Sequence, residues 1–335
     1  MNSQIRLHLD PTALAPIDKT AADWQRAALD WSLNIASERT RRAYLAAWQD
    51  FLGFVTVAPW EVTQSDVIAY KAALQTTPSE KTGKVLGQSS INQRLSALSS
   101  FFTFAQGRGL RPDNPVDGVK RDSVTPYGKA TWLSPKRNED RLLLATVDTS
   151  TIQGKRDKAI LLLALTAALR VGELASLTVG ALRRQGTAAF LTYRRKGGHI
   201  EEIPLAKEAA AALAVYLATR AGMTGDSPLF VATDRGRKAA ASIGRYGADE
   251  EKPLSSRAIR YLVGTYATHA FGPGHRIHPH SLRHTAAKVA EEQGRSFTDI
   301  SRLLKHKSPA ITTIYMQATS DNDEETAEVM GNRYA

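Results

Sequence analysis

The spacing of apolar residues divides the chain into an N-terminal series of helices and a longer region of mixed structure. Four N-terminal segments repeat apolar residues at helical spacing and are expected to form helices. They are residues 22–36, a segment starting at Thr40, 63–74 and 89–105. Thr40 and Thr63 suit the N-cap position, and Asp66 completes a capping box after Thr63. Gly107 and Gly109 end the pattern.

A change in composition follows the last of these helices. Residues 107–130 concentrate glycine, proline and charge, as linkers do. A chain of 335 residues also favours two domains. We therefore expect a flexible lead at 1–20, a helical domain at 21–110, a linker at 111–131 and a second domain at 132–335.

The second region combines both periodicities. Helical patterns cover 134–147, 155–169, 255–271, 280–294 and 297–307, the first with Ser134 as N-cap and Pro135 in its first turn. Short strand patterns cover 187–195, 197–205 and 227–233, with a turn at Gly197–Gly198 between the first two. The predicted fold class is mainly α with a small antiparallel β-sheet. It consists of an all-helical N-terminal domain and a mixed α/β domain that ends in a C-terminal helix within 319–335.

Charge narrows the class of partner. Lys plus Arg number 44 and Asp plus Glu 33, so the formal net charge is +11, which favours nucleic acid over membrane as the partner. The absence of cysteine excludes disulfides, thiol catalysis and thiolate metal sites. The chain has neither an apolar run long enough to span a bilayer nor an apolar N-terminal signal. We expect a soluble cytoplasmic protein.

Four separated segments concentrate cations, histidines and one tyrosine. They are "TAALRVGELASL" (166–177), "YRRKGGHIEEIPL" (193–205), "HPHSLRHTAAKVAEE" (278–292) and "LLKHKSPAITTIYM" (303–316). In this order they resemble the catalytic domain of the tyrosine recombinases, the phage integrase family, over most of 132–320. The matching positions are Arg170, Glu173, Lys196, His280, Arg283, His284, His306 and Tyr315. The preceding helical region resembles the core-binding domain of that family.

The resemblance implies a site-specific recombinase that breaks and rejoins DNA without a metal or other cofactor. It implies Tyr315 as the nucleophile, Lys196 as the general acid and His280 as the base or proton relay. Arg170, Arg283 and His306 would neutralise the charge that develops on the phosphate, a task for cationic hydrogen-bond donors where no metal is present. Glu173 and His284 would support these groups from behind.

Two positions depart from the family pattern. Ala168 stands where glycine is usual before Leu169, a change of one small residue for another that we expect to be without consequence. Lys305 stands where glycine is usual before His306. That lysine could alter the local backbone or add a phosphate contact.

Each assignment has a competing interpretation. Arg170 could cap helix carbonyls, and Arg194 and Arg195 are rivals of Lys196. Tyr315 could belong to the core. His280 and His284 have the i, i+4 spacing of a zinc pair, but Ser281 stands where such a helix carries glutamate, so we predict no metal.

The predicted partner is double-stranded DNA, held between the two domains. The candidate contacts are Arg39, Arg41, Arg42, Gln93, Arg94, Arg257 and Arg260. The resemblance implies a homo-tetramer on two sites with a Holliday junction intermediate, with a monomer in solution as the alternative for the free protein. Only about twenty residues precede the first helix, which favours a simple Xer-like or Cre-like recombinase without an arm-binding domain. A type IB topoisomerase and a non-catalytic DNA-binding protein are the alternatives.

Overall fold

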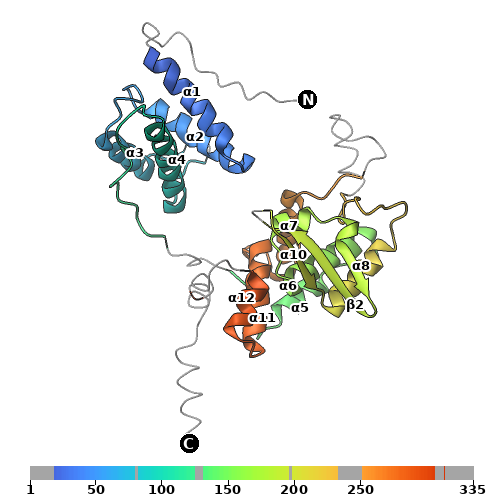
Figure 1. Ribbon diagram of the computed structural model, residues 1–335. Coiled ribbons are helices and arrows are strands. Elements are labelled where there is room, and N and C mark those ends of the chain that lie inside the picture. The colour runs from blue at the N-terminus through green and yellow to red at the C-terminus, as the bar shows by residue number, and fades with distance from the viewer. Residues whose placement is uncertain are drawn as a thin grey trace, which may run out of the picture. The chain divides into compact units, whose positions relative to one another are not determined.

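The chain folds into two compact units, shown in Figure 1. The structure is a computed structural model that describes residues 19–79, 82–124, 131–195, 198–232, 251–305 and 313. The first unit, Met1–Thr125, is here called the helical unit, and the second, Pro126–Ala335, the C-terminal unit. The described part of the chain contains no helix that is both long and apolar enough to cross a membrane.

The helical unit is built around one central helix. Its helices are α1 (Lys19–Asn34), α2 (Glu38–Phe54), α3 (Gln64–Thr76) and α4 (Gln88–Gly107), and α4 packs against the other three (Figure 1). The interior is dominated by aromatic side chains, with Phe101 of α4 fully buried at its centre. The four helices predicted from the apolar spacing are therefore present.

The helix starts follow local hydrogen bonding. Thr63 is the N-cap of α3, and the Asp66 carboxylate accepts the backbone N–H of Thr63. The predicted capping box is therefore confirmed. The prediction of Thr40 as a cap is wrong: α2 begins at Glu38, and the hydroxyl of Ser37 accepts the N–H of Thr40. A serine three residues earlier satisfies the same unpaired donors.

Residues 111–124, which the sequence analysis places in a linker, pack against the helical unit. The Asn114 side chain is buried and donates to Ser99 and Thr103 of α4. Val116 and Val119 are part of the same apolar core as Phe101. The glycines and prolines of this segment therefore shape a packed loop along α4, which composition alone does not distinguish from a linker.

The C-terminal unit has a second core, centred on α6 (Ile152–Thr166). Around it lie α5 (Glu139–Ala145), α7 (Val171–Ala175), α8 (Lys207–Leu217), α10 (Ser256–Phe271), α11 (Pro279–Glu292) and α12 (Phe297–Leu304). The core is mainly aliphatic, and α6 packs directly on α8, α11 and α5 (Figure 1). The sequence analysis does not predict α8, although its alanine-rich sequence favours a helix.

The predicted start of the first helix in this unit is wrong. Residues 135–138 form a turn, and α5 begins only at Glu139. The N-cap is Asn138 and not Ser134, whose backbone N–H donates to the Glu139 carboxylate at 2.8 Å. Asn138 precedes the helix in a left-handed conformation, φ +54°, which asparagine tolerates better than most residues.

A three-stranded antiparallel sheet completes the C-terminal unit, in the order β1 (Leu182–Gln185), β2 (Ala188–Arg194), β3 (Ile200–Pro204). Strands β2 and β3 are the predicted hairpin, with Arg194 opposite Ile200. Strand β1 is not predicted, because its sequence LRRQ has no apolar alternation. The side chain of Arg183 instead holds it, lying over the Phe190 ring and pairing with Glu202.

The third predicted strand, 227–233, is not part of this sheet. Its described residues make only isolated bridges, Thr178 with Pro228 and Val231 with Pro253. Leu229 and Phe230 are buried in the core. The segment is therefore apolar because it crosses the interior, and burial rather than strand pairing produced the pattern.

Candidate active site

The first predicted segment places Arg170 between two helices. Arg170 is the N-cap of α7, directly after the turn that ends α6. The Glu173 carboxylate accepts the Arg170 backbone N–H at 2.7 Å, and its other oxygen accepts a guanidinium N–H at 3.1 Å. Glu173 is buried, whereas the Arg170 side chain is 40% exposed. The carboxylate therefore fixes one side of the guanidinium while the remaining donors stay accessible.

Arg283 joins three segments that are distant in sequence. Its side chain is buried in the first turns of α11 and donates to the carbonyl oxygens of Ala168 and Leu304. The first carbonyl precedes Arg170, and the second ends α12, two residues before His306. A planar guanidinium suits this role because its donors point in fixed, diverging directions.

Both departures from the family pattern have left-handed backbone. Ala168 has φ +49° and Lys305, the C-cap of α12, has φ +48°. An L-residue in this conformation costs about 1–2 kcal/mol relative to right-handed geometry, a cost that glycine largely avoids. The change at Ala168 therefore carries a backbone cost, contrary to expectation. It is held in a small apolar cluster with Ala286, Ile300 and Leu304.

The β2–β3 hairpin reaches the end of α12 through a polar cluster. Glu201 on β3 accepts from the Arg195 guanidinium at 3.0 Å and from the Lys305 ammonium at 3.2 Å. Arg195 also donates to the carbonyl oxygen of Lys305. These contacts bring the second and fourth predicted segments together. The structure thus joins all four segments, although Lys196, His306 and Tyr315 lie outside the described residues.

His280 occupies the first turn of α11, beside these cations. Burial of its ring lowers the pKa to about 4, and the positive charges of Arg283, His278 and Arg170 act in the same direction. The residue as a whole is nevertheless exposed, so solvent reaches part of it. At pH 7 the imidazole is neutral and can accept a proton.

The two histidines near His280, His284 and His278, make contacts that support the structure of α11. The His284 ring is buried and makes an edge-on contact with His280, with the ring centroids 4.4 Å apart. His278 is the N-cap of α11, and its Nδ1 accepts the backbone N–H of Ser281 at 3.1 Å. Within the described ranges, no group of three or more His, Asp or Glu residues could hold a metal ion.

A second tyrosine, Tyr193, lies close to the site, but its surroundings do not suit a nucleophile. Tyr193 on β2 is 6% exposed, and burial together with the charges of Glu173 and Glu201 raises its pKa above the usual value. A buried phenol with a raised pKa is harder to ionise and to reach than an exposed one. Arg194, one rival of Lys196, is exposed, whereas the other, Arg195, is engaged with Glu201 and Lys305.

The candidate DNA contacts separate into two groups. The exposed members are Arg39, Arg42, Gln93, Arg257 and Arg260, and Arg42 also forms a surface ion pair with Glu38 one turn earlier on α2. Arg41 and Arg94 are half-buried and have partners within the helical unit: Arg41 donates to the Ile35 carbonyl, and Arg94 pairs with Asp50 and Tyr70. The partners of Arg94 come from other helices, so its sequence spacing does not reveal them.

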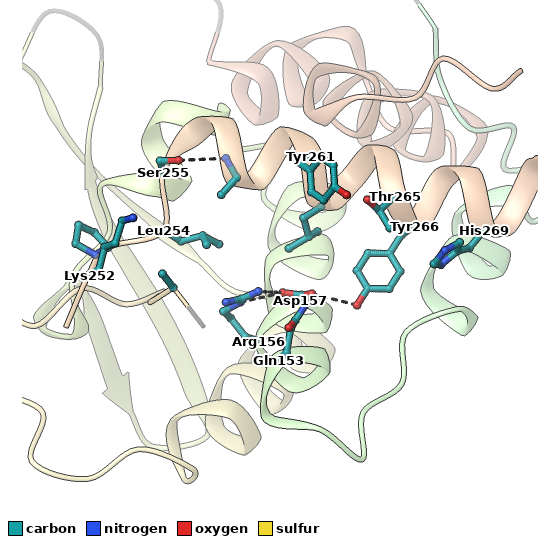
Figure 2. A pocket seen from close by; sticks show the side chains of 14 residues that line it. Gln153, Arg156, Asp157, Lys252, Leu254, Ser255, Tyr261, Thr265, Tyr266 and His269 are labelled. Atoms are coloured by element: carbon teal, nitrogen blue, oxygen red, sulfur yellow. Dashed lines mark hydrogen bonds and ion pairs between the residues drawn. The ribbon is translucent and has the colours of Figure 1, made fainter. Parts of the chain in front are cut away.

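A cavity of about 470 Å³ lies apart from these groups, between α6 and α10 (Figure 2). Its wall contains a buried ion pair of Arg156 with Asp157, and the Tyr266 hydroxyl donates to Asp157 at 3.1 Å (Figure 2). Burial raises the pKa of Asp157, although Arg156 pulls it down. Arg170, His280 and Arg283 do not line this cavity, so it is distinct from the candidate active site.

Comparison with known proteins agrees with this arrangement. The phage integrase family matches residues 136–322, and the N-terminal SAM-like domain of phage integrases matches residues 26–110. The chain belongs to the phage integrase family, whose members are the tyrosine recombinases. Two predictions are therefore confirmed. The chain is a tyrosine recombinase of the Xer type, and its fold is mainly α with a small antiparallel β-sheet.

Individual relatives cover most of the chain. Tyrosine recombinase XerC of Thermodesulfovibrio yellowstonii is 29% identical, over 83% of this chain and 85% of its own. Tyrosine recombinase XerD of Caulobacter vibrioides is 28% identical, over 86% and 88%. Among solved structures, lambda integrase bound to DNA has a TM-score of 0.63 at 17% identity, over 91% of this chain and 98% of that chain. This last likeness shows a shared fold.

Proposed function

We propose that this protein is a site-specific recombinase that cleaves double-stranded DNA through Tyr315 and rejoins it without a cofactor. The observation that carries the proposal is the contact between the predicted segments. Arg283 bonds the carbonyls of Ala168 and Leu304, and Arg195 bonds that of Lys305. Two of these three contacts join residues more than one hundred positions apart, and together they connect all four predicted segments.

The first task of the site is to neutralise charge. A phosphodiester carries one negative charge, and its displacement by an oxygen nucleophile adds more to the transferring oxygens. Arg170, Arg283 and His306 are the proposed donors, and loss of one such donor from a preorganised site typically costs about 3–4 kcal/mol. The buried Glu173 positions Arg170 and leaves part of its guanidinium exposed for a phosphate. The planar guanidinium of arginine can donate two parallel hydrogen bonds to two oxygens of one phosphate.

The second task is to move two protons. The Tyr315 oxygen attacks the scissile phosphorus while its proton passes to His280, whose lowered pKa keeps the ring neutral at pH 7. The bond from phosphorus to the 5′ oxygen breaks, and that oxygen takes a proton from Lys196. The product is a 3′-phosphotyrosine and a free 5′-hydroxyl. His284 packs against the His280 ring and supports its orientation.

Rejoining reverses these steps with another strand. The phosphotyrosine conserves the energy of the broken bond, so an incoming 5′-hydroxyl restores the phosphodiester without ATP. We propose that four copies on two sites exchange strands through a Holliday junction, as the family resemblance implies. The preferred duplex contacts are the candidates with exposed side chains, Arg39, Arg42, Gln93, Arg257 and Arg260. The DNA substrate also fits the cytoplasmic location expected from the sequence.

A covalent adduct tests the proposal directly. The protein is incubated with nicked duplexes carrying candidate sites recovered from its own bound DNA, so that cleavage releases a short strand and traps the intermediate. We expect a protein–DNA adduct that Tyr315→Phe abolishes. The matched control is Tyr193→Phe, which removes the buried neighbouring phenol and should retain the adduct. If Tyr315→Phe retained the adduct, the nucleophile would be another residue.

The same preparation separates recombination from DNA relaxation. A two-site plasmid should yield recombinant products whose amount depends on the presence of both sites. Relaxation of a supercoiled plasmid without those sites, at a comparable rate, would favour a type IB topoisomerase. An absence of both activities, together with tight binding, would favour a non-catalytic DNA-binding protein.

A further inference from the structure

Lys305 is the unexpected residue of the site, because it occupies a position where its own backbone is unfavourable. It ends α12 with φ +48°, a conformation that glycine adopts at little cost. The family pattern has glycine here, yet this chain carries a long charged side chain. Unfavourable backbone that persists at a functional site points to a role for the residue that bears it.

The lysine side chain is not directed into open solvent. Its ammonium lies 3.2 Å from the Glu201 carboxylate, and both side chains are 27% exposed. The bond from Lys305 is the first cause of the lowered pKa of Glu201, and the guanidinium of Arg195 acts in the same direction. Glu201 is therefore ionised and paired with two cations at neutral pH.

The partners of Lys305 connect two catalytic segments. Arg195 directly precedes Lys196, and Lys305 directly precedes His306. Arg195 reaches the Lys305 carbonyl and also fixes its own hairpin, where its backbone N–H donates to His199 at 2.8 Å. Arg195, Glu201 and Lys305 thus bind the tip of the β2–β3 hairpin to the end of α12 by side-chain and backbone contacts together.

We propose that Arg195, Glu201 and Lys305 form an ionic latch, in which Lys305 is a positioning residue that holds the Lys196 hairpin against the His306 segment. In this proposal the latch acts on the site only through its chain neighbours Lys196 and His306. It rests on the proposed function, because its effect on rate presupposes cleavage by Tyr315. A phosphate contact by Lys305 is the competing role, and the two differ in what they do to DNA affinity.

The test compares four variants in single-turnover cleavage at saturating protein. Lys305→Met removes the charge and keeps the length, Lys305→Arg keeps the charge, Lys305→Gly restores the family residue, and Glu201→Gln removes the partner charge. We expect Lys305→Met and Glu201→Gln to cleave DNA about tenfold more slowly than the wild type, because each loses an ion pair that helps to position the site. Lys305→Arg should recover most of the rate, and the dissociation constant for DNA should stay within about twofold.

Two further readouts separate positioning from stability. Lys305→Gly should melt at a higher temperature than Lys305→Met, because glycine relieves the left-handed backbone, and yet cleave as slowly. The double variant Lys305→Met with Glu201→Gln should be no slower than Glu201→Gln alone, because Glu201→Gln already removes the ion pair that Lys305→Met breaks. Arg302→Gln on α12, whose side chain is 77% exposed, removes a charge one turn away and serves as the control.

A measurement independent of cleavage completes the test. The amides of Arg195 and Gly198 are hydrogen-bonded across the hairpin turn, and Lys305→Met should accelerate their hydrogen exchange several-fold. Cleavage and exchange both unchanged in Lys305→Met would overturn the latch, as would a fall in DNA affinity equal to the fall in rate. If the wild-type protein forms no adduct, the proposed function fails, and the exchange measurement alone decides whether the hairpin is latched.

Discussion

The interiors of the two units are built from different chemistry. The helical unit packs aromatic rings around Phe101, which lies within 6 Å of Trp24, Trp31, Trp48 and Phe102, measured between ring centroids. The C-terminal unit has an aliphatic core and also buries charged groups. Its described buried polar residues are Arg156, Asp157, Glu173, Ser281, Arg283, His284 and Thr285, against Ser32 and Asn114 in the helical unit.

The two interiors meet different needs. The helical unit needs stability alone, whereas the C-terminal unit must also fix the positions of charged groups. Burial of apolar rings stabilises the helical unit without fixing any particular polar group. Burial of a charge is costly unless it is paired, so each charged residue inside the C-terminal unit has specific partners. Arg283 pairs with two carbonyls and Glu173 with Arg170. These pairings set the site geometry, and the aliphatic core supplies the stability that permits them.

The largest expected effect is on the aromatic interior. Phe101→Ala should lower the free energy of unfolding of the helical unit by about 3–5 kcal/mol, as removal of a fully buried ring does. Tryptophan fluorescence in urea measures this, since Trp24, Trp31, Trp48 and Trp60 all belong to that unit. Phe54→Ala, at a ring that is 41% exposed, is the matched control and should lose much less. An equal loss in both variants would contradict the aromatic core.

The next effect concerns the paired charge. Arg283→Ala should slow cleavage on the order of 10²–10³-fold, because it removes a proposed donor to the transition state. It should also destabilise the C-terminal unit by about 1–3 kcal/mol, since the Ala168 and Leu304 carbonyls lose their donor. Single-turnover rates are compared well below the melting temperature, with DNA affinity measured alongside.

The control for this prediction is Arg257→Ala, at an exposed side chain of α10. It should weaken DNA binding modestly and reduce its salt dependence, while the cleavage rate at saturation stays close to wild type. A collapse of DNA affinity in Arg283→Ala, with a normal rate for the DNA that remains bound, would exclude Arg283 from transition-state stabilisation.

The smallest effect is a pH dependence confined to the C-terminal unit. His280 has a folded-state pKa of about 4, below the ordinary value of 6.5, so the unfolded chain binds more protons between these values. Its contribution to stability is complete above pH 6.5 and is lost as pH falls towards 4. His280→Asn should flatten this part of the stability profile, measured by urea unfolding from pH 7 to 4.

The helical unit provides the internal comparison for this experiment, because residues 19–124 contain no histidine. Its unfolding should respond equally to pH in the wild type and in His280→Asn. The wild-type cleavage rate should likewise show no inflection near pH 6.5 caused by His280. An inflection there that disappears in His280→Asn would mean that the ring titrates normally, without the influence of its cationic neighbours.

Most of the helices and the β2–β3 hairpin follow from sequence periodicity. The failures have physical causes: β1 is polar and depends on Arg183 pairing with Phe190 and Glu202 across strands. The segment 227–233 is apolar because the core buries it. In both cases the deciding contacts are made with other segments of the chain. The spacing of residues within one segment does not reveal them.

The sequence by itself determined the family, through four motifs in order, and the identity of the candidate residues. Folding sets how far each cation is exposed, as the partly exposed Arg170 and the buried Arg283 show, and it pairs Arg94 with Asp50 while Arg39 stays exposed. Only the tertiary structure revealed the contact of Lys305 with Glu201. The physical reason is that residue type fixes what a side chain can bind, whereas burial and partners, which folding brings from elsewhere, fix what it does bind.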